Sequence, residues 1–297
     1  MKRFRGIYRL LPHIVFIVLA ALVWTSPAVS GNKIIFLVLI AAVETALLTR
    51  RRSASACDIA LIVFLFLAAW EIYSTRIQGA NTMLVPPPEK VFAIYVSDWR
   101  KIFSGIFSSL RLLFTALFFA LALGISLGML IGWFERPRKA FFPIAKIISP
   151  IPPIIYSPYA VALLPSFRSA SLFIIFSSIF WPIFMNMIIS VSTVDRRILE
   201  SAKTLNIDSL SMFLHVLFPY CLPRVLSGMT VIVSTSFMVL TAAELLGATS
   251  GLGWFVKYYA DFADYTRVIA GIIMIGVVVT ALNRLVAAAE KILIRWK

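Results

Sequence analysis

Few side chains in this 297-residue chain could do acid–base or metal chemistry, and they are far apart in the sequence. The two histidines and two cysteines belong to no motif with metal-ligand or redox spacing. No G-x-x-x-x-G-K-[ST] phosphate loop is present, so no ATPase chemistry is expected of the chain. A membrane-embedded enzyme would need a His/Asp/Glu or Ser/Lys constellation, and none stands out. We predict a non-catalytic protein without a metal site.

Two polar residues lie inside long apolar stretches, where polar side chains are costly and usually paired or functional. Glu244 lies near the end of one stretch; it is either a gate or protein contact, or the partner of Arg111 or Arg267 in a helix-end salt bridge. Asn186 can line a path or make a hydrogen bond between helices. We predict that Glu244 and Asn186 belong to a translocation path or gate.

A proline-rich crossing adds three further candidates. Six prolines lie in or beside residues 143–164, and each interior proline removes a backbone hydrogen bond. Broken backbone at membrane depth is tolerated only where it is buried in protein or lines a wet cavity. Tyr156, Ser157 and Tyr159 supply polar groups near the break. We assign them to the same path or gate, against the alternative of a merely kinked helix inside a bundle.

The longest connection between apolar stretches predicts two short helices joined by a turn. Asp195 can cap the first helix, Asn206 can end it in the left-handed conformation, and Asp208 can cap the second. Pro219 and Pro223 are then expected to close the unit. Such a loop is typical of a docking surface for another protein, although a helix lying flat on lipid is the alternative. The expected apolar side of the first helix consists of Ile198, Ala202 and Leu205.

The elements that carry these residues must sit in a membrane. Apolar residues make up 61% of the chain and charged residues 14%, against about 45–50% and about 25% in soluble domains. We therefore predict an all-α polytopic membrane helix bundle and exclude a soluble enzyme, a disordered regulator and a disulfide-stapled secreted module. About eight stretches are long enough, or nearly so, to span a bilayer: 11–30, 33–49, 57–74, 106–134, 143–164, 170–193, 226–247 and 267–290.

Charge sets the expected orientation. Lys and Arg number 28 against 13 Asp and Glu, and the basic residues lie in short runs between the apolar stretches rather than in a patch for nucleic acid. A cytoplasmic N-terminus places 19 of them inside and nine outside, so both termini are expected in the cytoplasm. The first stretch also fits a cleavable signal peptide ending at Ser30, which would leave seven spans with unchanged directions.

The loop at 194–223 resembles the EAA loop of permease subunits from binding-protein-dependent ABC importers. That pattern is EAA, three residues, Gly, nine residues, then I-x-L-P. This chain keeps the spacing and has Glu200-Ser201-Ala202, then Asn206, then Val216-Leu217-Phe218-Pro219. Three further segments are similar to the nitrate/sulfonate/taurine branch of that family: LVPPPEKVF, ISPIPPIIYSP and AELLGATSGLGWFV. The clear departure is the segment 163–173, where the branch usually has a Phe-Gly turn.

The resemblance implies a permease subunit that carries a small solute, such as nitrate, a sulfonate or a vitamin precursor. It implies a six-helix type I importer core at 57–297, with 1–56 as two added N-terminal helices. Cytoplasmic ATPase subunits would dock on Glu200, Ser201, Ala202, Asn206 and Pro219, and would bind the ATP and Mg²⁺, so no cofactor is expected on this chain. A second permease copy or homologue and an extracytoplasmic solute-binding protein complete the expected complex in the bacterial inner membrane.

An ion-coupled secondary transporter is the alternative function. Such transporters usually show internal repeats and intramembrane charges near the midplane. The chain shows no convincing repeat, and its acidic residues cluster towards the ends of the apolar stretches. The importer permease is therefore the favoured interpretation.

Overall fold

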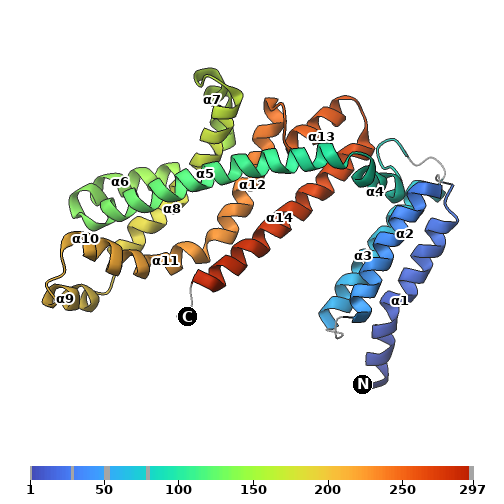
Figure 1. The fold of residues 1–297 in the computed structure, drawn as a ribbon, viewed down its shortest axis with the longest axis horizontal. Helices are drawn as coiled ribbons and strands as arrows, with labels where there is room; N and C mark the ends of the chain where they lie inside the picture. Colours follow the sequence, from blue (N-terminus) through green and yellow to red (C-terminus); the bar gives the residue numbers. More distant parts are fainter. Residues whose placement is uncertain (1, 28–29, 50–53, 78–80, 294–297) are drawn as a thin grey trace. The chain divides into compact units, whose positions relative to one another are not determined.

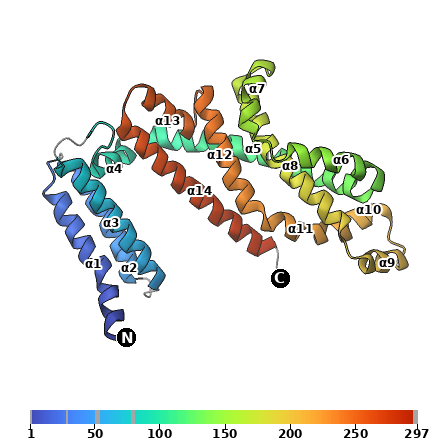
Figure 2. The same cartoon turned by 180° about the vertical axis from the view of Figure 1, so that it is seen from behind.

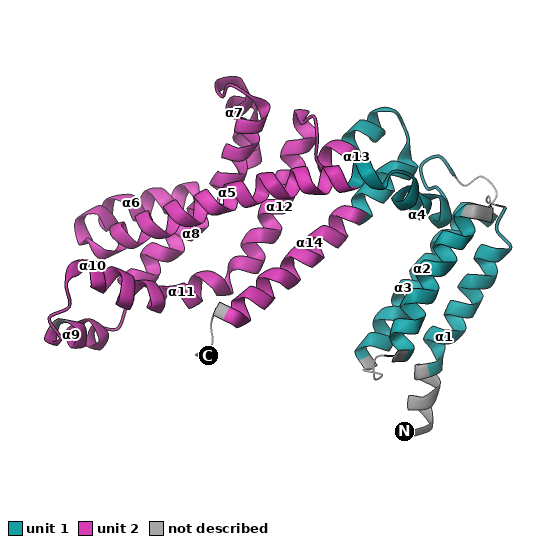
Figure 3. Ribbon diagram, in the orientation of Figure 1, with its two compact units in different colours: residues 1–102, 256–273 teal, residues 103–255, 274–297 magenta. Residues whose placement is uncertain are grey.

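The computed structural model describes residues 2–27, 30–49, 54–77 and 81–293. Every regular element in these ranges is helical, which confirms the predicted class (Figure 1). The chain divides into two compact units, one of residues 1–102 with 256–273 and one of residues 103–255 with 274–297 (Figure 3). Three helices continue from one unit into the other: α5 (Trp99–Trp133), α13 (Leu252–Asp261) and α14 (Tyr265–Leu293).

The first unit is built on three long helices that run side by side in both views (Figures 1 and 2). Phe36 and Phe64 are fully buried in their shared core, and Phe36 stacks on Phe92 with ring centroids 5.1 Å apart. Phe92 belongs to α4 (Pro88–Ser97), a short helix that follows the three consecutive prolines. The three long helices are α1 (Lys2–Trp24), α2 (Ser30–Thr49) and α3 (Ala54–Arg76).

The first unit also encloses carboxylates. Glu71 of α3 and Glu89 of α4 are both 0% exposed, and the Ser26 hydroxyl donates a hydrogen bond of 2.5 Å to Glu89 Oε1. The proline segment before α4 is tied to α3, because Trp70 Nε1 donates to the Pro86 carbonyl at 2.9 Å. This hydrogen bond holds the segment of three prolines against a helix of the first unit.

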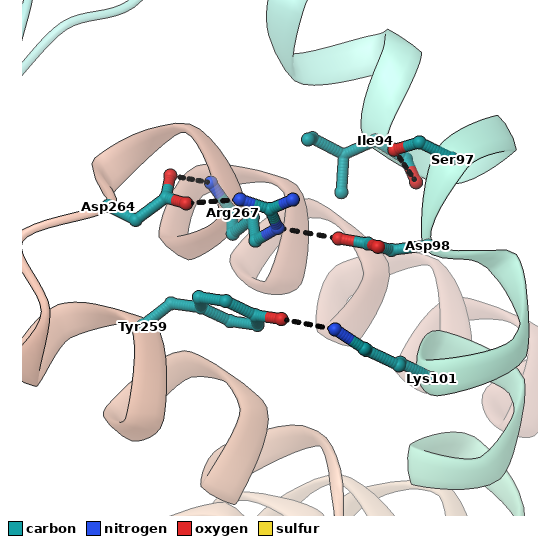
Figure 4. A network of polar contacts seen from close by, with 7 residues as sticks. All are labelled: Ile94, Ser97, Asp98, Lys101, Tyr259, Asp264 and Arg267. Atoms are coloured by element: carbon teal, nitrogen blue, oxygen red, sulfur yellow. Dashed lines mark hydrogen bonds and ion pairs between the residues drawn. The ribbon is translucent and has the colours of Figure 1, made fainter.

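A polar network joins the start of α5 to α13 and α14 within the first unit (Figure 4). Arg267 is its centre: Nε donates to Asp98 Oδ2 and Nη1 donates to Asp264 Oδ2, each at 2.5 Å. Lys101 Nζ donates to the Tyr259 hydroxyl at 3.1 Å, and the Arg267 guanidinium lies over the Tyr259 ring. The two carboxylates thus hold one cation between helices that are far apart in the sequence.

Tyr95 adds a buried link to the same unit. Burial raises the pKa of its phenol above the ordinary value, so the hydroxyl keeps its proton and donates to the Ala270 carbonyl at 2.8 Å. This bond fastens α4 to α14.

The second unit contains the rest of α5 and the helices up to α12. One continuous apolar core runs through it and includes Ile179, Ile183, Phe237 and Leu240, which are at most 1% exposed. Its remaining elements are α6 (Glu135–Ile148), η1 (Pro153–Tyr156), α7 (Ser157–Leu163), α8 (Phe167–Ser192), α9 (Arg196–Thr204), α10 (Ser209–Ser211), a π-helical turn (Met212–Leu217), α11 (Phe218–Ser227) and α12 (Met229–Gly247).

Glycines allow a close contact between two helices of the second unit. Gly124, Gly128 and Gly132 lie four residues apart on α5 and face α8. A Cβ built on Gly128 would lie 2.7 Å from Met187 Cβ and 2.9 Å from the Phe184 carbonyl oxygen. Because no larger side chain fits, the backbones of α5 and α8 approach each other directly, as small-residue interfaces in membranes allow.

Six helices are long and apolar enough to cross a membrane, counted over the described residues. Five of them coincide with predicted spans. The predicted span 143–164 is broken, since the helix Glu135–Ile148 and the helical stretch Pro153–Leu163 meet at 83° and would count as a seventh crossing together. In α1 the apolar part, Leu10–Trp24, is shorter than a span. The sixth is Ser209–Ser227, which the sequence analysis assigned to a loop.

The glycine contact supplies a stability prediction. Replacing Gly128 with Ala should lower the free energy of unfolding by about 1–3 kcal/mol, because the new methyl group meets backbone and Met187 Cβ. The matched control is Gly276→Ala on α14, where an added Cβ meets nothing within 4 Å. Thermal unfolding of both variants in the same detergent measures the difference. Equal melting temperatures for the two variants would contradict the contact.

Candidate functional site

Glu244 is the centre of a buried hydrogen-bonded cluster in the second unit. Its carboxylate is 3% exposed; Oε1 accepts from the Ser109 hydroxyl at 2.6 Å, and Oε2 accepts from the Gly253 amide at 2.7 Å. Ser109 Oγ in turn accepts from the Leu252 amide at 2.9 Å. A buried carboxylate is stable only when such donors replace its water. The cluster therefore fastens the turn between α12 and α13 onto α5.

Two glycines let this turn approach the carboxylate. Gly251 has φ of +122°, and a Cβ there would overlap the Glu244 carboxylate. A Cβ on Gly253 would lie 2.6 Å from the Thr241 carbonyl oxygen and 2.8 Å from Glu244 Cβ. The Gly-Leu-Gly sequence is thus required both by backbone conformation and by lack of space.

The alternative prediction for Glu244, a helix-end salt bridge with Arg111 or Arg267, is wrong. Among the described residues no Lys, Arg or His nitrogen forms an ion pair with it, and Arg267 pairs with Asp98 and Asp264 instead. The physical reason is that a hydroxyl and a backbone amide already occupy both carboxylate oxygens. Whether Glu244 also acts as a gate stays a prediction.

A cavity of about 420 Å³ opens beside Glu244, within the size range of small-molecule sites. Its walls come from α5, the first turns of α8, and the turn after α12. The lining is rich in guanidinium and hydroxyl groups. These are Arg111, Arg168, Ser104, Ser108, Ser171, Thr249 and Ser250.

The other predicted path residues do not line this cavity. Ser157 is buried and donates to the Ile154 carbonyl at 2.6 Å, while Tyr159 is 72% exposed on α7. The Tyr156 ring meets Phe173 of α8 with centroids 6.4 Å apart. Asn186 is half-buried in the middle of α8. Of the five, only Glu244 reaches the cavity, so the structure does not bring the set together; the path role of the other four stays a prediction.

The predicted loop helix is α9, and its local signals are confirmed. Asp195 Oδ1 accepts from the Arg197 amide at 2.9 Å, Asn206 has φ of +53°, and the Asp208 side chain accepts from the Ser211 amide at 3.2 Å. On α9 itself, Glu200 pairs with Arg196 at 2.8 Å. Both of these side chains are exposed, so α9 presents charge on its outer side.

The apolar side of α9 is only partly as predicted. Ala202 is 5% exposed and packs in the core of the second unit. The Ser201 carbonyl accepts a hydrogen bond of 2.7 Å from the Thr204 hydroxyl. Leu205 lies one residue past the end of α9 and is 74% exposed, as expected of an apolar side left open for docking. The left-handed turn at Asn206 follows directly and ends the helix, as predicted.

The prediction that Pro219 and Pro223 close the loop is also wrong. Both prolines lie inside α11, which continues from the π-helical turn Met212–Leu217. In that turn the Phe218 amide bonds to the Phe213 carbonyl, five residues back. A proline removes one amide and crowds the preceding turn, and the wider π turn accommodates this without ending the helix.

The cavity and α9 lie at opposite ends of α8. Phe167, Arg168 and Ser171 in the first turns of α8 line the cavity, and α9 follows the last residue of α8 after a short turn. The 26 residues of α8 span about 39 Å at 1.5 Å per residue. Figure 1 shows α9 at the end of the second unit away from the turn after α12. One continuous helix thus connects the two candidate sites.

Three residues that contribute to this region were not predicted from the sequence. Ser109, which binds Glu244, is an ordinary serine in an apolar stretch and had no local signal. Arg168 and Ser171 lie in the segment 163–173, whose departure from the family pattern was the available signal. The glycine series Gly124, Gly128 and Gly132 also went unnoticed, although its four-residue spacing in an apolar helix is readable from the sequence.

Comparisons with known proteins agree with one another. Residues 120–295 match the family described as binding-protein-dependent transport system inner membrane component. Nitrate import permease protein NrtB of Synechocystis sp. is 28% identical over 246 residues, covering 79% of this chain and 88% of NrtB. Taurine transport system permease protein TauC of Escherichia coli is 26% identical over 241 residues, covering 77% and 86%.

A solved structure supports the fold. The inward-facing MetNI methionine ABC transporter contains a chain similar to this one, with a TM-score of 0.52 and 18% sequence identity. The similarity covers 65% of this chain and 97% of that chain. At this level of identity the likeness concerns the arrangement of helices.

The Glu244 cluster generates the second prediction. Glu244→Ala should speed amide hydrogen exchange in residues 248–253 by at least about tenfold, because it leaves the Gly253 amide and Ser109 without their acceptor. Glu244→Gln keeps the shape and one acceptor, so it should retain most of the protection. Exchange measured by mass spectrometry checks this. Equal protection in the parent and in Glu244→Ala would show that the carboxylate does not hold the turn.

Proposed function

Because the chain belongs to the family of binding-protein-dependent transport system inner membrane components, it is a permease subunit of an ABC importer, and we propose that its solute path begins at the cavity beside Glu244. The observation that carries this proposal is the position of the cavity and α9 at opposite ends of α8. Family membership replaces the alternative of an ion-coupled secondary transporter.

The proposed docking element for the ATPase subunits is α9. It buries Ala202 in the core and exposes Arg196 and Glu200 on the outside, so it is both anchored and accessible. A force on α9 passes into α8 through a short connection, which suits a rocking motion between inward and outward states. Ser201, Asn206 and Pro219 complete the proposed docking region. ATP and Mg²⁺ would bind on the partner, with no cofactor on this chain.

The rest of the proposed complex follows from the same arrangement. An extracytoplasmic solute-binding protein would deliver solute at the cavity end, and a second permease copy or homologue would close the path. Tyr156, Ser157, Tyr159 and Asn186 are proposed to line that path; the 83° break beside the first three supports this, because bent backbone needs a protein or water contact. The chain spans the bacterial inner membrane, and both termini are proposed to lie in the cytoplasm.

The solute is proposed to be small and to carry an oxyanion group. The printed names of two relatives support this class, since one imports nitrate and the other transports taurine, which carries a sulfonate. A vitamin precursor is the other substrate class that the sequence analysis proposed.

Docking can be tested by charge reversal on α9. Glu200→Lys should abolish recovery of the ATPase subunit when the tagged permease is purified from membranes in mild detergent. The fold should persist, because the exposed Arg196–Glu200 pair is worth only about 0.3–0.5 kcal/mol.

The control is Glu135→Lys on α6. Glu135 forms an equally exposed pair with Lys139, four residues on, at 2.7 Å. Loss of the ATPase in both variants, or in neither, would contradict docking on α9. A parent permease that purifies without any ATPase, under conditions where known complexes survive, would contradict the importer complex itself.

A further inference from the structure

The cavity beside Glu244 carries an excess of positive charge. Arg111 on α5 and Arg168 on α8 both line it, and neither forms an ion pair with any described residue. The acidic side chain in the lining, Glu244, has both oxygens bound, to Ser109 and to the Gly253 amide. Both guanidinium groups are exposed and so remain available to an anion that enters.

A buried hydroxyl in the same cavity lacks a partner. Ser171 is 2% exposed, lines the cavity, and its Oγ has no hydrogen-bond partner in the described structure. A buried polar group left unpaired costs about 1–3 kcal/mol, so such a group in a cavity points to a ligand that completes it. Ser108 and Ser250, by contrast, already bond to each other at 2.8 Å.

The first turn of α8 adds a third donor group. Ser166 caps this 26-residue helix by accepting from the Ser169 amide at 3.1 Å. Phe167 and Arg168 both line the cavity. Because they begin the helix, no preceding turn supplies carbonyl groups to accept hydrogen bonds from their amides. The positive end of the helix dipole therefore points to the region where Arg168 and Ser171 lie.

The cavity is larger than an oxyanion needs, and part of its wall is apolar. Its volume is about 420 Å³, and Phe107, Leu112 and Phe167 line it together with the polar groups. An inorganic ion alone would leave these apolar surfaces in contact with water. An organic body of a few carbon atoms would cover them and gain the free energy of apolar burial.

We propose that this cavity is a binding site for an organic oxyanion, a small sulfonate or carboxylate, on its way through the permease. Arg111 and Arg168 bind the anionic group from two helices, Ser171 donates a hydrogen bond to it, and the apolar wall takes the organic body. The assignment rests on the proposed import function. It also gives a role to the segment 163–173, which departs from the family pattern and supplies both Arg168 and Ser171.

The test uses the intact complex of permease and ATPase in phosphatidylcholine nanodiscs, without binding protein. Calorimetry compares 1-propanesulfonate with its uncharged analogue, methyl propyl sulfone, and with nitrate. We expect binding of the sulfonate, at least about tenfold weaker binding of the sulfone, and weaker binding of nitrate. Sulfone binding as tight as that of the sulfonate would overturn the anion site.

Variants locate the bound group. Arg111→Gln and Arg168→Gln should each weaken sulfonate binding about tenfold or more. Arg100→Gln, on the same helix as Arg111 but outside the cavity, should leave it unchanged. Ser171→Ala should weaken binding without lowering the melting temperature of the ligand-free complex, because it removes a hydroxyl that has no partner. A merely structural serine would show no binding change, which would count against its assigned role.

Three outcomes would overturn the assignment while leaving the import function intact, because recovery of the ATPase is measured in the same preparation. In the first, the ATPase is recovered but no sulfonate binds. In the second, sulfonate binds equally to the parent and both arginine variants, but the variants lose stimulation by the binding protein; the arginines would then contact an acidic surface of that protein. In the third, a short-chain soluble phosphatidylglycerol displaces the bound sulfonate from the parent complex, which would identify a lipid-phosphate site.

Discussion

The buried carboxylate of Glu244 is the interaction on which the candidate site depends. An ionisable group buried in a protein needs hydrogen-bond donors in place of the water it has lost. Here the donors are the Ser109 hydroxyl and the Gly253 amide, which come from α5 and from the start of α13. Satisfying one carboxylate therefore brings three helices together, and the turn that results forms one wall of the cavity.

Lipid imposes a second constraint, on the backbone. Helices that face lipid must keep their hydrogen bonds internal, so irregular stretches need support from neighbouring protein. The prolines of the chain have two different effects on the backbone. Those of α11 are preceded by a π turn that keeps the helix continuous. Those between α6 and α7 break the helix, with a bend of 83°. Where α5 meets α8, glycines at every fourth residue replace side-chain packing with direct backbone approach.

The first unit has a core and a polar network of its own. Its aromatic core lies between α1, α2, α3 and α4, and Arg267 with its two aspartates fastens the start of α5 to α13 and α14. The family match begins at residue 120 and therefore leaves the first three helices outside it. The fully buried Glu71 and Glu89 show that the first unit encloses carboxylates as well as apolar side chains.

Composition and periodicity alone were enough to determine the helical class, the membrane as solvent, five spans, and the capped turn around Asn206, because these depend on hydropathy and on neighbouring residues. The two loop prolines were misjudged, since whether a helix continues past a proline depends on packing and on the adjacent π turn. The cavity was decided only in three dimensions. Arg111, Arg168 and Ser171 lie up to 60 positions apart, and nothing local distinguishes them from loop charges and helix serines. They meet because Glu244 and the glycines of α5 fix where the helices cross.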